Sequence, residues 1–194
     1  MESSKDIPIK FVDSLDTQKH IVLFYDNLEY AQRIEFQFLK KGLERGEHCI
    51  YAMSEDPKLV KEKMASYGIP VEEFLAKNLM HIYQLSDPSN DPKGPLKGAQ
   101  KNAEMIMSDL KAPFRIVSNL FPNEKTDESI SAHLAIEHDF QVSFNKFQGS
   151  VICPYDIQKV KENRRKDWFD GLLDTHHTAI YAPKSGLGGV FDLQ

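Results

Sequence analysis

Apolar residues follow two alternating patterns along the chain: short continuous runs, and longer segments in which apolar positions recur every three or four residues. The run at 21–25, IVLFY, is too short for a helix and is typical of a strand buried on both faces of a parallel sheet. A helical pattern follows, with apolar residues at Tyr30, Ala31, Ile34, Phe38 and Leu39. A second apolar run then begins at His48. Residues 21–56 therefore predict a strand, a helix and a second strand, the βαβ unit of a parallel sheet.

The same two patterns continue through the rest of the chain. Further strands are predicted at 79–85, 115–118, 150–153 and 178–183. Further helices are predicted at 57–67, 71–76, 99–111, 129–147 and 159–166. Because strands that alternate with helices are typical of α/β proteins, we expect a three-layer α/β/α sandwich around a mostly parallel central sheet.

The two ends of the chain lie outside this repeating pattern. Residues 1–19 are predicted to form a short strand or an ordered arm rather than a helix, and residues 184–194 a glycine-rich tail or hairpin. Residues 86–98 are rich in proline and glycine and predict a long loop, either a solvated excursion or a lid. With 194 residues, 41% of them hydrophobic, the chain has the size of one domain spanning 1–194.

Composition and charge limit the partners that are expected. The chain has 29 acidic and 24 basic residues without a long block of either sign, so direct binding of nucleic acid is not expected. No apolar run is long enough to span a membrane and no signal peptide is recognisable, so we expect a cytoplasmic protein with no membrane partner. Cys49 and Cys153 lie within apolar runs, which is typical of buried thiols and does not indicate a disulfide framework.

Ligands of parallel α/β sheets bind where the carboxyl ends of the strands meet. The candidate ligand-binding residues at that edge are Tyr25, Asp26, Asn27, Ser54, Glu55, Asn119, Cys153, Tyr155 and Asp156. Aromatic walls with a few hydrogen-bonding groups favour a small, weakly polar ligand over a polyanion.

Residues 36–85, FQFLKKGLERGEHCIYAMSEDPKLVKEKMASYGIPVEEFLAKNLMHIYQL, resemble the corresponding segment of RecA/KaiC-type ATPase domains. In those ATPases the first strand leads into GxxxxGK[ST], whose backbone N–H groups and lysine hold phosphates. Here residues 25–32 read YDNLEYAQ, with no glycine, no lysine and two carboxylates. The strand at 115–118 also ends without the carboxylate that holds Mg²⁺ in such enzymes. The resemblance implies a RecA/KaiC-like scaffold without Walker motifs, and no cofactor is expected.

Four short segments in a fixed order are similar to the MEDS family, a sensory domain of methanogens and methylotrophs. They are HIVLFY at 20–25, GEHCIY at 46–51, ICPYD at 152–156 and HHTAIY at 176–181. The resemblance implies a non-catalytic sensor of small hydrocarbon derivatives, and it adds His176 and His177 to the candidate ligand-binding residues. Because adjacent residues of a strand point to opposite sides, at least one of these two histidines is expected to be structural.

The signal of such a sensor has to reach another molecule. Longer members of the family carry a DNA-binding helix-turn-helix or a kinase domain, and neither pattern is found in this sequence. We therefore expect the output to pass through a separate signalling or regulatory protein, or through a homo-oligomer, whose affinity changes when ligand binds.

Three other functions are compatible with the sequence. The first is a metal site, for which the candidate ligands are Cys49, Cys153, Asp156, His176 and His177, since thiolate and imidazole suit zinc or copper. The second is an enzyme with Cys153 as nucleophile, a histidine base and Asp156 as orienting residue, although the proline after Cys153 removes a backbone N–H from the oxyanion position. The third is a former ATPase retained as an interaction or oligomerisation module.

For three further polar residues a structural role is weighed against a role in a site: the family resemblance places a histidine at the start of the first strand, and His133 with Glu137 could be half of a metal site. His20 precedes the first strand, at the amino end, which is the opposite edge from the ligand crevice. His133 and Glu137 are four residues apart on one face of a predicted helix. Because they do not form the H-E-x-x-H spacing of a zinc-binding helix, we expect a solvated pair.

Overall fold

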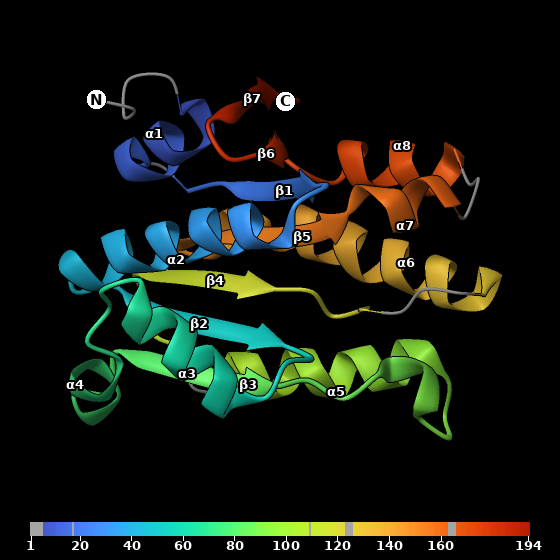
Figure 1. The fold of residues 1–194 in the computed structure, drawn as a ribbon. Coiled ribbons are helices and arrows are strands. Elements are labelled where there is room, and N and C mark those ends of the chain that lie inside the picture. Colours follow the sequence, from blue (N-terminus) through green and yellow to red (C-terminus); the bar gives the residue numbers. More distant parts are fainter. Residues whose placement is uncertain (1–5, 17, 109, 123–125, 163–165) are drawn as a thin grey trace.

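The computed structural model describes residues 6–16, 18–108, 110–122, 126–162 and 166–194, and its centre is a seven-stranded sheet (Figure 1). The strands lie in the order β3-β2-β4-β5-β1-β6-β7, and all neighbouring pairs are parallel except β6 and β7. Their bounds are β1 His20–Tyr25, β2 His48–Met53, β3 Met80–Gln84, β4 Phe114–Ser118, β5 Gly149–Asp156, β6 Thr178–Lys184 and β7 Leu187–Asp192. The mostly parallel sheet predicted from the sequence is confirmed.

Helices cover both faces of the sheet. Helices α1 to α4 pack on one face and α5 to α8 on the other, which confirms the three-layer sandwich (Figure 1). The helix bounds are α1 Ile7–Ser14, α2 Leu28–Glu44, α3 Pro57–Ser66, α4 Val71–Ala76, α5 Pro95–Ser108, α6 Asp127–Ser143, α7 Ile157–Glu162 and α8 Lys166–Asp174, with short 3₁₀ turns η1 Pro88–Asn90 and η2 Phe144–Lys146. Among the described residues no helix has the length and apolar character needed to cross a membrane.

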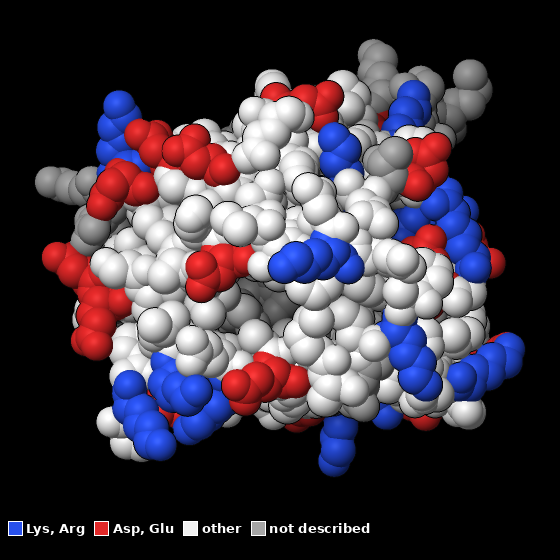
Figure 2. Space-filling model, turned by 180° about the vertical axis from the view of Figure 1, so that it is seen from behind, with Lys and Arg blue, Asp and Glu red and all other residues white. Residues whose placement is uncertain are grey.

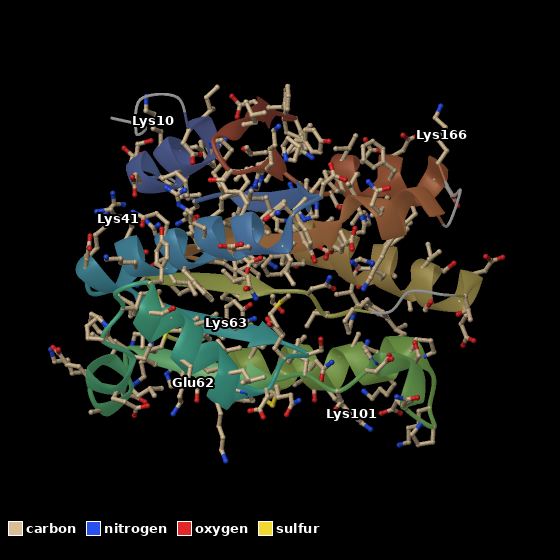
Figure 3. All side chains as sticks on the ribbon, viewed as in Figure 1. Lys10, Lys41, Glu62, Lys63, Lys101 and Lys166 are labelled. Carbon is tan, nitrogen blue, oxygen red and sulfur yellow. The ribbon has the colours of Figure 1, made fainter. Side chains whose placement is uncertain are left out.

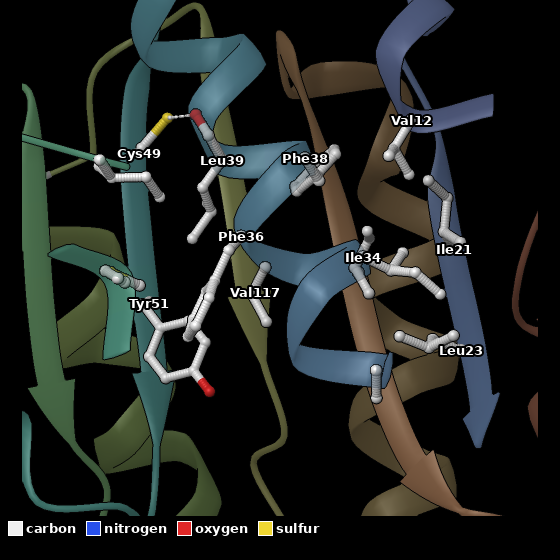
Figure 4. Packing of buried hydrophobic residues seen from close by; sticks show 14 of the residues in the cluster. Val12, Ile21, Leu23, Ile34, Phe36, Phe38, Leu39, Cys49, Tyr51 and Val117 are labelled. Carbon is white, nitrogen blue, oxygen red and sulfur yellow. Dashed lines mark hydrogen bonds between the residues drawn. The ribbon is translucent and has the colours of Figure 1, made fainter. Parts of the chain in front are cut away.

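Alternation along the strands assigns side chains to the two faces. In β1, Ile21 and Leu23 join the core beneath α2, whereas Val22 and Phe24 join the core beneath α6 and α8. Figure 4 shows the first of these cores, with Phe36 and Phe38 of α2 packed toward the strands. A central strand therefore contributes to two separate apolar interiors, which explains its continuously apolar sequence.

At the chain ends, the expectation of a strand or ordered arm for residues 1–19 is wrong, and the hairpin expected as one alternative for residues 184–194 is confirmed. The N-terminal segment contains the helix α1, which begins after the N-cap Asp6, has Pro8 in its first turn and buries Val12. The C-terminal segment contains β7, which returns antiparallel to β6 through a turn at Gly186, where φ is +75°. The long loop expected at 86–98 is shorter, because η1 and the first turn of α5 occupy part of it. Residues 163–165 of the helix predicted at 159–166 lie outside the described residues.

One buried cation holds several loops against the sheet. The side chain of Arg115 on β4 is 2% exposed. Its Nε donates to Glu47 Oε2 at 2.7 Å, and its two other nitrogens donate to the carbonyl oxygens of Phe38 and Leu15 at 3.0 and 3.1 Å. Arg115 therefore joins β4, α2, the segment after α1 and the start of β2 through charge-assisted hydrogen bonds.

We predict that Arg115→Leu lowers the free energy of unfolding by about 3 kcal/mol, because Glu47 and a buried carbonyl oxygen lose their donor. Urea denaturation followed by circular dichroism measures this change. The matched control is Arg33→Leu, whose side chain is 47% exposed and should cost less than about 1 kcal/mol. Equal effects of the two substitutions would contradict the role given to Arg115.

Candidate functional site

The carboxyl edge of the sheet forms a cleft, as the sequence predicted. Six of the predicted residues line a cavity of about 200 Å³ there: Tyr25, Ser54, Glu55, Asn119, Tyr155 and Asp156. Asn27 lies at the same edge but caps α2 by accepting the backbone N–H of Tyr30 at 2.8 Å. Asp26 accepts the hydroxyl of Tyr181 at 2.7 Å, so a carboxylate stands in the loop where a phosphate loop would need donors.

Acidic residues give this cleft its electrostatic character. Tyr51 donates to Glu55 Oε2 at 2.9 Å and lies 3.3 Å from Glu35 Oε2. Burial, together with the negative charge of Glu55, raises the pKa of Glu35 to about 8. Lys63 of α3 pairs with Glu55 at 2.9 Å from the solvent side (Figure 3). The cleft is therefore unsuited to a polyanion, which agrees with the missing phosphate loop.

A second cavity opens on the opposite face of the sheet. It measures about 270 Å³ and lies between α5, α6 and the strands β4 and β5. Its walls are mainly apolar and are formed by Ala103, Ile106, Met107, Ile116, Leu120, Ile136, Phe140, Phe147 and Val151. Figure 2 shows this face, with a hollow near its centre and charged side chains around the rim. We call this cavity the α5/α6 pocket.

Buried polar residues form the inner wall of the α5/α6 pocket. His20, Glu137 and Cys153 line it, and His176 lies directly behind them. Glu137 Oε2 is 3.3 Å from His20 Nε2 and 3.8 Å from His176 Nε2, and Cys153 Sγ is 3.5 Å from His20 Nε2. All four side chains are at least nine-tenths buried, and we call this group the His/Glu/Cys cluster.

Side chains from α6, β5 and α8 surround Oε1, the other carboxylate oxygen of Glu137. Tyr155 donates its hydroxyl to Glu137 Oε1 at 3.0 Å, and His133 Nε2 lies 3.2 Å from the same oxygen. Trp168 Nε1, which can only donate, lies 3.3 Å from His133 Nδ1. The proton of neutral His133 is therefore on Nε2, where it faces Glu137 and Tyr155.

These contacts determine the charge states within the cluster. Burial acts to raise the pKa of Glu137, but hydrogen bonds from His133 and His20 outweigh it and hold that pKa well below its ordinary value. Burial, with the charge of His20, lowers the pKa of His176 to about 3. Burial and the nearby Glu137 raise the pKa of the Cys153 thiol. The protein therefore encloses a carboxylate and a neutral imidazole beside an apolar cavity.

The expectation that His133 and Glu137 form a solvated pair is wrong. His20 and His133 are fully buried and Glu137 is 6% exposed. A signal was present in the sequence: positions 130, 133, 134, 137, 141 and 144 form one stripe at helical spacing, and this stripe faces the sheet. His20 packs beside them against α6, away from the carboxyl edge where ligand binding was expected.

The residues named in the metal and enzyme hypotheses are only partly brought together in the structure. Cys153 and His176 are brought together, but Cys49 lies on the other face and donates to the carbonyl of Leu39 (Figure 4). Asp156 is three residues after Cys153 on the same strand, so its side chain points to the opposite face. The enzyme hypothesis, in which Cys153, a histidine and Asp156 act together, is therefore wrong about Asp156. His177 accepts the backbone N–H of His20 at 3.0 Å, the structural role expected for one histidine of the pair.

A family model described as the MEthanogen/methylotroph, DcmR Sensory domain, MEDS, matches residues 19–176. This range covers four fifths of the chain and agrees with the resemblance drawn from the sequence. No curated protein matches the chain significantly.

Two solved structures from the archaeon Pyrococcus horikoshii are similar in fold. One is a KaiC-like protein, 14% identical with a TM-score of 0.56, covering 89% of this chain and 76% of its own. The other is an uncharacterized protein in complex with an unknown peptide, 12% identical with a TM-score of 0.55, covering 85% of this chain and 78% of its own. These similarities confirm the predicted RecA/KaiC-like α/β fold.

We predict that Glu35→Gln stabilises the protein at neutral pH but not at acidic pH. Below pH 4.5 Glu35 is protonated in both the folded and unfolded states, whereas between pH 4.5 and about 8 only the unfolded state loses the proton. The free energy of unfolding of the wild type therefore falls by about 1.4 kcal/mol per pH unit within this range, and the variant lacks this contribution.

Thermal or urea unfolding of both proteins at several values between pH 4.5 and 8 measures the difference. The matched control is Glu62→Gln, an exposed carboxylate on α3 (Figure 3). A difference between Glu35→Gln and wild type that does not grow with pH would contradict the buried, neutral state of Glu35.

Proposed function

The chain belongs to the MEDS family of sensory domains, and from this premise we propose that it is a non-catalytic sensor whose small, weakly polar ligand binds in the α5/α6 pocket. The observation that carries the proposal is the size and lining of this cavity, about 270 Å³ with mainly apolar walls. An engineered apolar cavity of about 150 Å³ is enough to bind benzene. The α5/α6 pocket therefore suits a short hydrocarbon derivative.

The pocket also offers polar groups that can orient such a ligand. Ser118 lines it, and the hydroxyl oxygen of Ser118 is buried without a hydrogen-bond partner among the described residues. The carboxylate of Glu137 lies at the inner wall. A few polar groups in a mainly apolar cavity are the usual means of ligand orientation.

A sensor also requires that ligand binding changes the protein. The pocket lies between two helices, α5 and α6, and the fixed sheet, so a ligand that fits one spacing of these helices better than another shifts their positions. We propose that this movement alters the surface seen by a separate regulatory protein or by a second copy of the chain. The loop at Asp26, which lacks phosphate-binding groups, supports a role without ATP hydrolysis.

The methionines of α5 provide a direct test. Met107 lines the pocket, whereas Met105 on the same helix is similarly exposed but does not line it. We predict that short alcohols, thiols and benzene shift the ¹³C-methyl NMR signal of Met107 with saturation, and leave the signal of Met105 unchanged.

A variant whose larger side chain fills the pocket tests the same proposal. Ala103→Phe should weaken this binding by at least about tenfold, because the new ring occupies ligand space. Ala135→Phe, at an exposed position on α6, is the control and should bind as the wild type does. Equal shifts at Met105 and Met107, or binding unaffected by Ala103→Phe, would contradict the proposal.

A further inference from the structure

We infer that the His/Glu/Cys cluster is a binding site for a transition-metal ion of the zinc type. His20 at the start of β1, Glu137 on α6, Cys153 on β5 and His176 before β6 each direct one possible ligand atom to a common point. This inference rests on the cluster itself and does not depend on a ligand in the α5/α6 pocket.

The separations of the ligand atoms fit such an ion. Four atoms that surround a tetrahedral zinc ion at 2.0–2.3 Å lie roughly 3.3 to 3.8 Å from one another. The observed separations are 3.3 Å from His20 Nε2 to Glu137 Oε2, 3.5 Å from His20 Nε2 to Cys153 Sγ, and 3.8 Å from His176 Nε2 to Glu137 Oε2. All four atoms lie within 4.8 Å of one another, so small side-chain rotations complete the site.

The second observation is a buried acceptor without a partner. His176 is fully buried, and its Nε2 has no hydrogen-bond partner among the described residues. Its Nδ1 lies 2.6 Å from the carbonyl oxygen of Leu172, which can only accept, so Nδ1 carries the proton. The lone pair of Nε2 therefore points into the cluster.

His20 presents its ring in the same way. Its Nδ1 lies 3.1 Å from the amide oxygen of Gln141. The orientation of that amide is set by Gln194, whose side-chain oxygen accepts from Gln141 Nε2 at 3.0 Å. Without a metal, His20 Nε2 donates to Glu137 Oε2 at 3.3 Å; a metal ion displaces that proton, and the ring already directs Nε2 toward Glu137 Oε2 and Cys153 Sγ. Two imidazoles, one carboxylate and one thiol therefore converge in a buried space, which is a donor arrangement suited to a transition-metal cation.

Outer contacts hold these ligands in position, as in known metal sites. Each imidazole contacts an oxygen atom through its remote nitrogen, and this contact orients the ring so that Nε2 faces the cluster. Glu137 is held through Oε1 by Tyr155 and His133, so Oε2 remains available. The arrangement matches the carboxylate and carbonyl partners that orient metal-binding histidines.

The donor set indicates the class of ion. Calcium and magnesium prefer oxygen ligands only, whereas two imidazoles, one thiolate and one carboxylate suit zinc, cobalt or copper. Because His20, Glu137 and Cys153 also line the α5/α6 pocket, the ion lies at its inner wall, within reach of a small molecule bound there.

The test uses the metal alone. The full chain is freed of metal with a chelator and titrated with Zn²⁺ and with Co²⁺, and bound metal is measured by elemental analysis after gel filtration. We expect one equivalent of either ion, and with Co²⁺ the strong visible bands of a tetrahedral site together with thiolate-to-cobalt charge transfer. Less than 0.1 equivalent, or a cobalt spectrum without thiolate charge transfer, would overturn the inference.

The two cysteines form a matched pair of variants. Cys153→Ser should abolish the charge-transfer band and weaken Zn²⁺ binding by more than about 100-fold, beyond the loss typical of an outer partner. Cys49→Ser, which replaces the buried thiol on the other face, should retain both. Loss of the band in Cys49→Ser would place the thiolate elsewhere and overturn the site. If Cys153→Ser does not fold, wild type and Cys49→Ser together still decide the question.

Discussion

The burial of one carboxylate beneath α6 determines how the α5 to α8 face of this protein is built. An ionised carboxylate without water is costly unless it is hydrogen-bonded or paired with a cation, so Glu137 must be surrounded by suitable groups. Tyr155 comes from β5, His133 from α6 itself, His20 from the start of β1 and His176 from the segment before β6. The polar interior therefore ties together elements from the beginning, middle and end of the chain.

The two faces of the sheet consequently carry different chemistry. Beneath α2 the interior is apolar around Ile21, Leu23 and Val117, with Arg115 as a structural cation near the amino edge. Beneath α6 the interior contains the His/Glu/Cys cluster and the α5/α6 pocket. The strict alternation of side chains along the strands keeps these chemistries apart, even where both use residues of the same strand.

The relation to KaiC-like proteins is one of scaffold. The fold is similar, but at the carboxyl edge of this sheet Asp26 and Asn27 are engaged in hydrogen bonds of the protein itself, and Glu55 adds a further carboxylate. Such an edge repels the phosphates that a RecA-like ATPase holds there. One fold can carry different functions, because function depends on the sites built on it rather than on the fold itself.

Local patterns in the sequence were sufficient for the α/β class, most strands and helices, and the set of residues at the carboxyl edge, because short continuous apolar runs mark buried strands and the 3.6-residue period marks the buried face of a helix. They also marked Cys153 as a residue of interest, whereas His176 entered through the resemblance to the MEDS family. The error at the N-terminal end, α1, arose from a short element whose stability comes from packing against the rest of the fold. Only the tertiary structure decided that His20 and Glu137 meet Cys153 and His176 and that Cys49 and Asp156 do not. Convergence of side chains from β1, α6, β5 and the segment before β6 depends on strand order, register and helix position, which no local spacing in the sequence specifies.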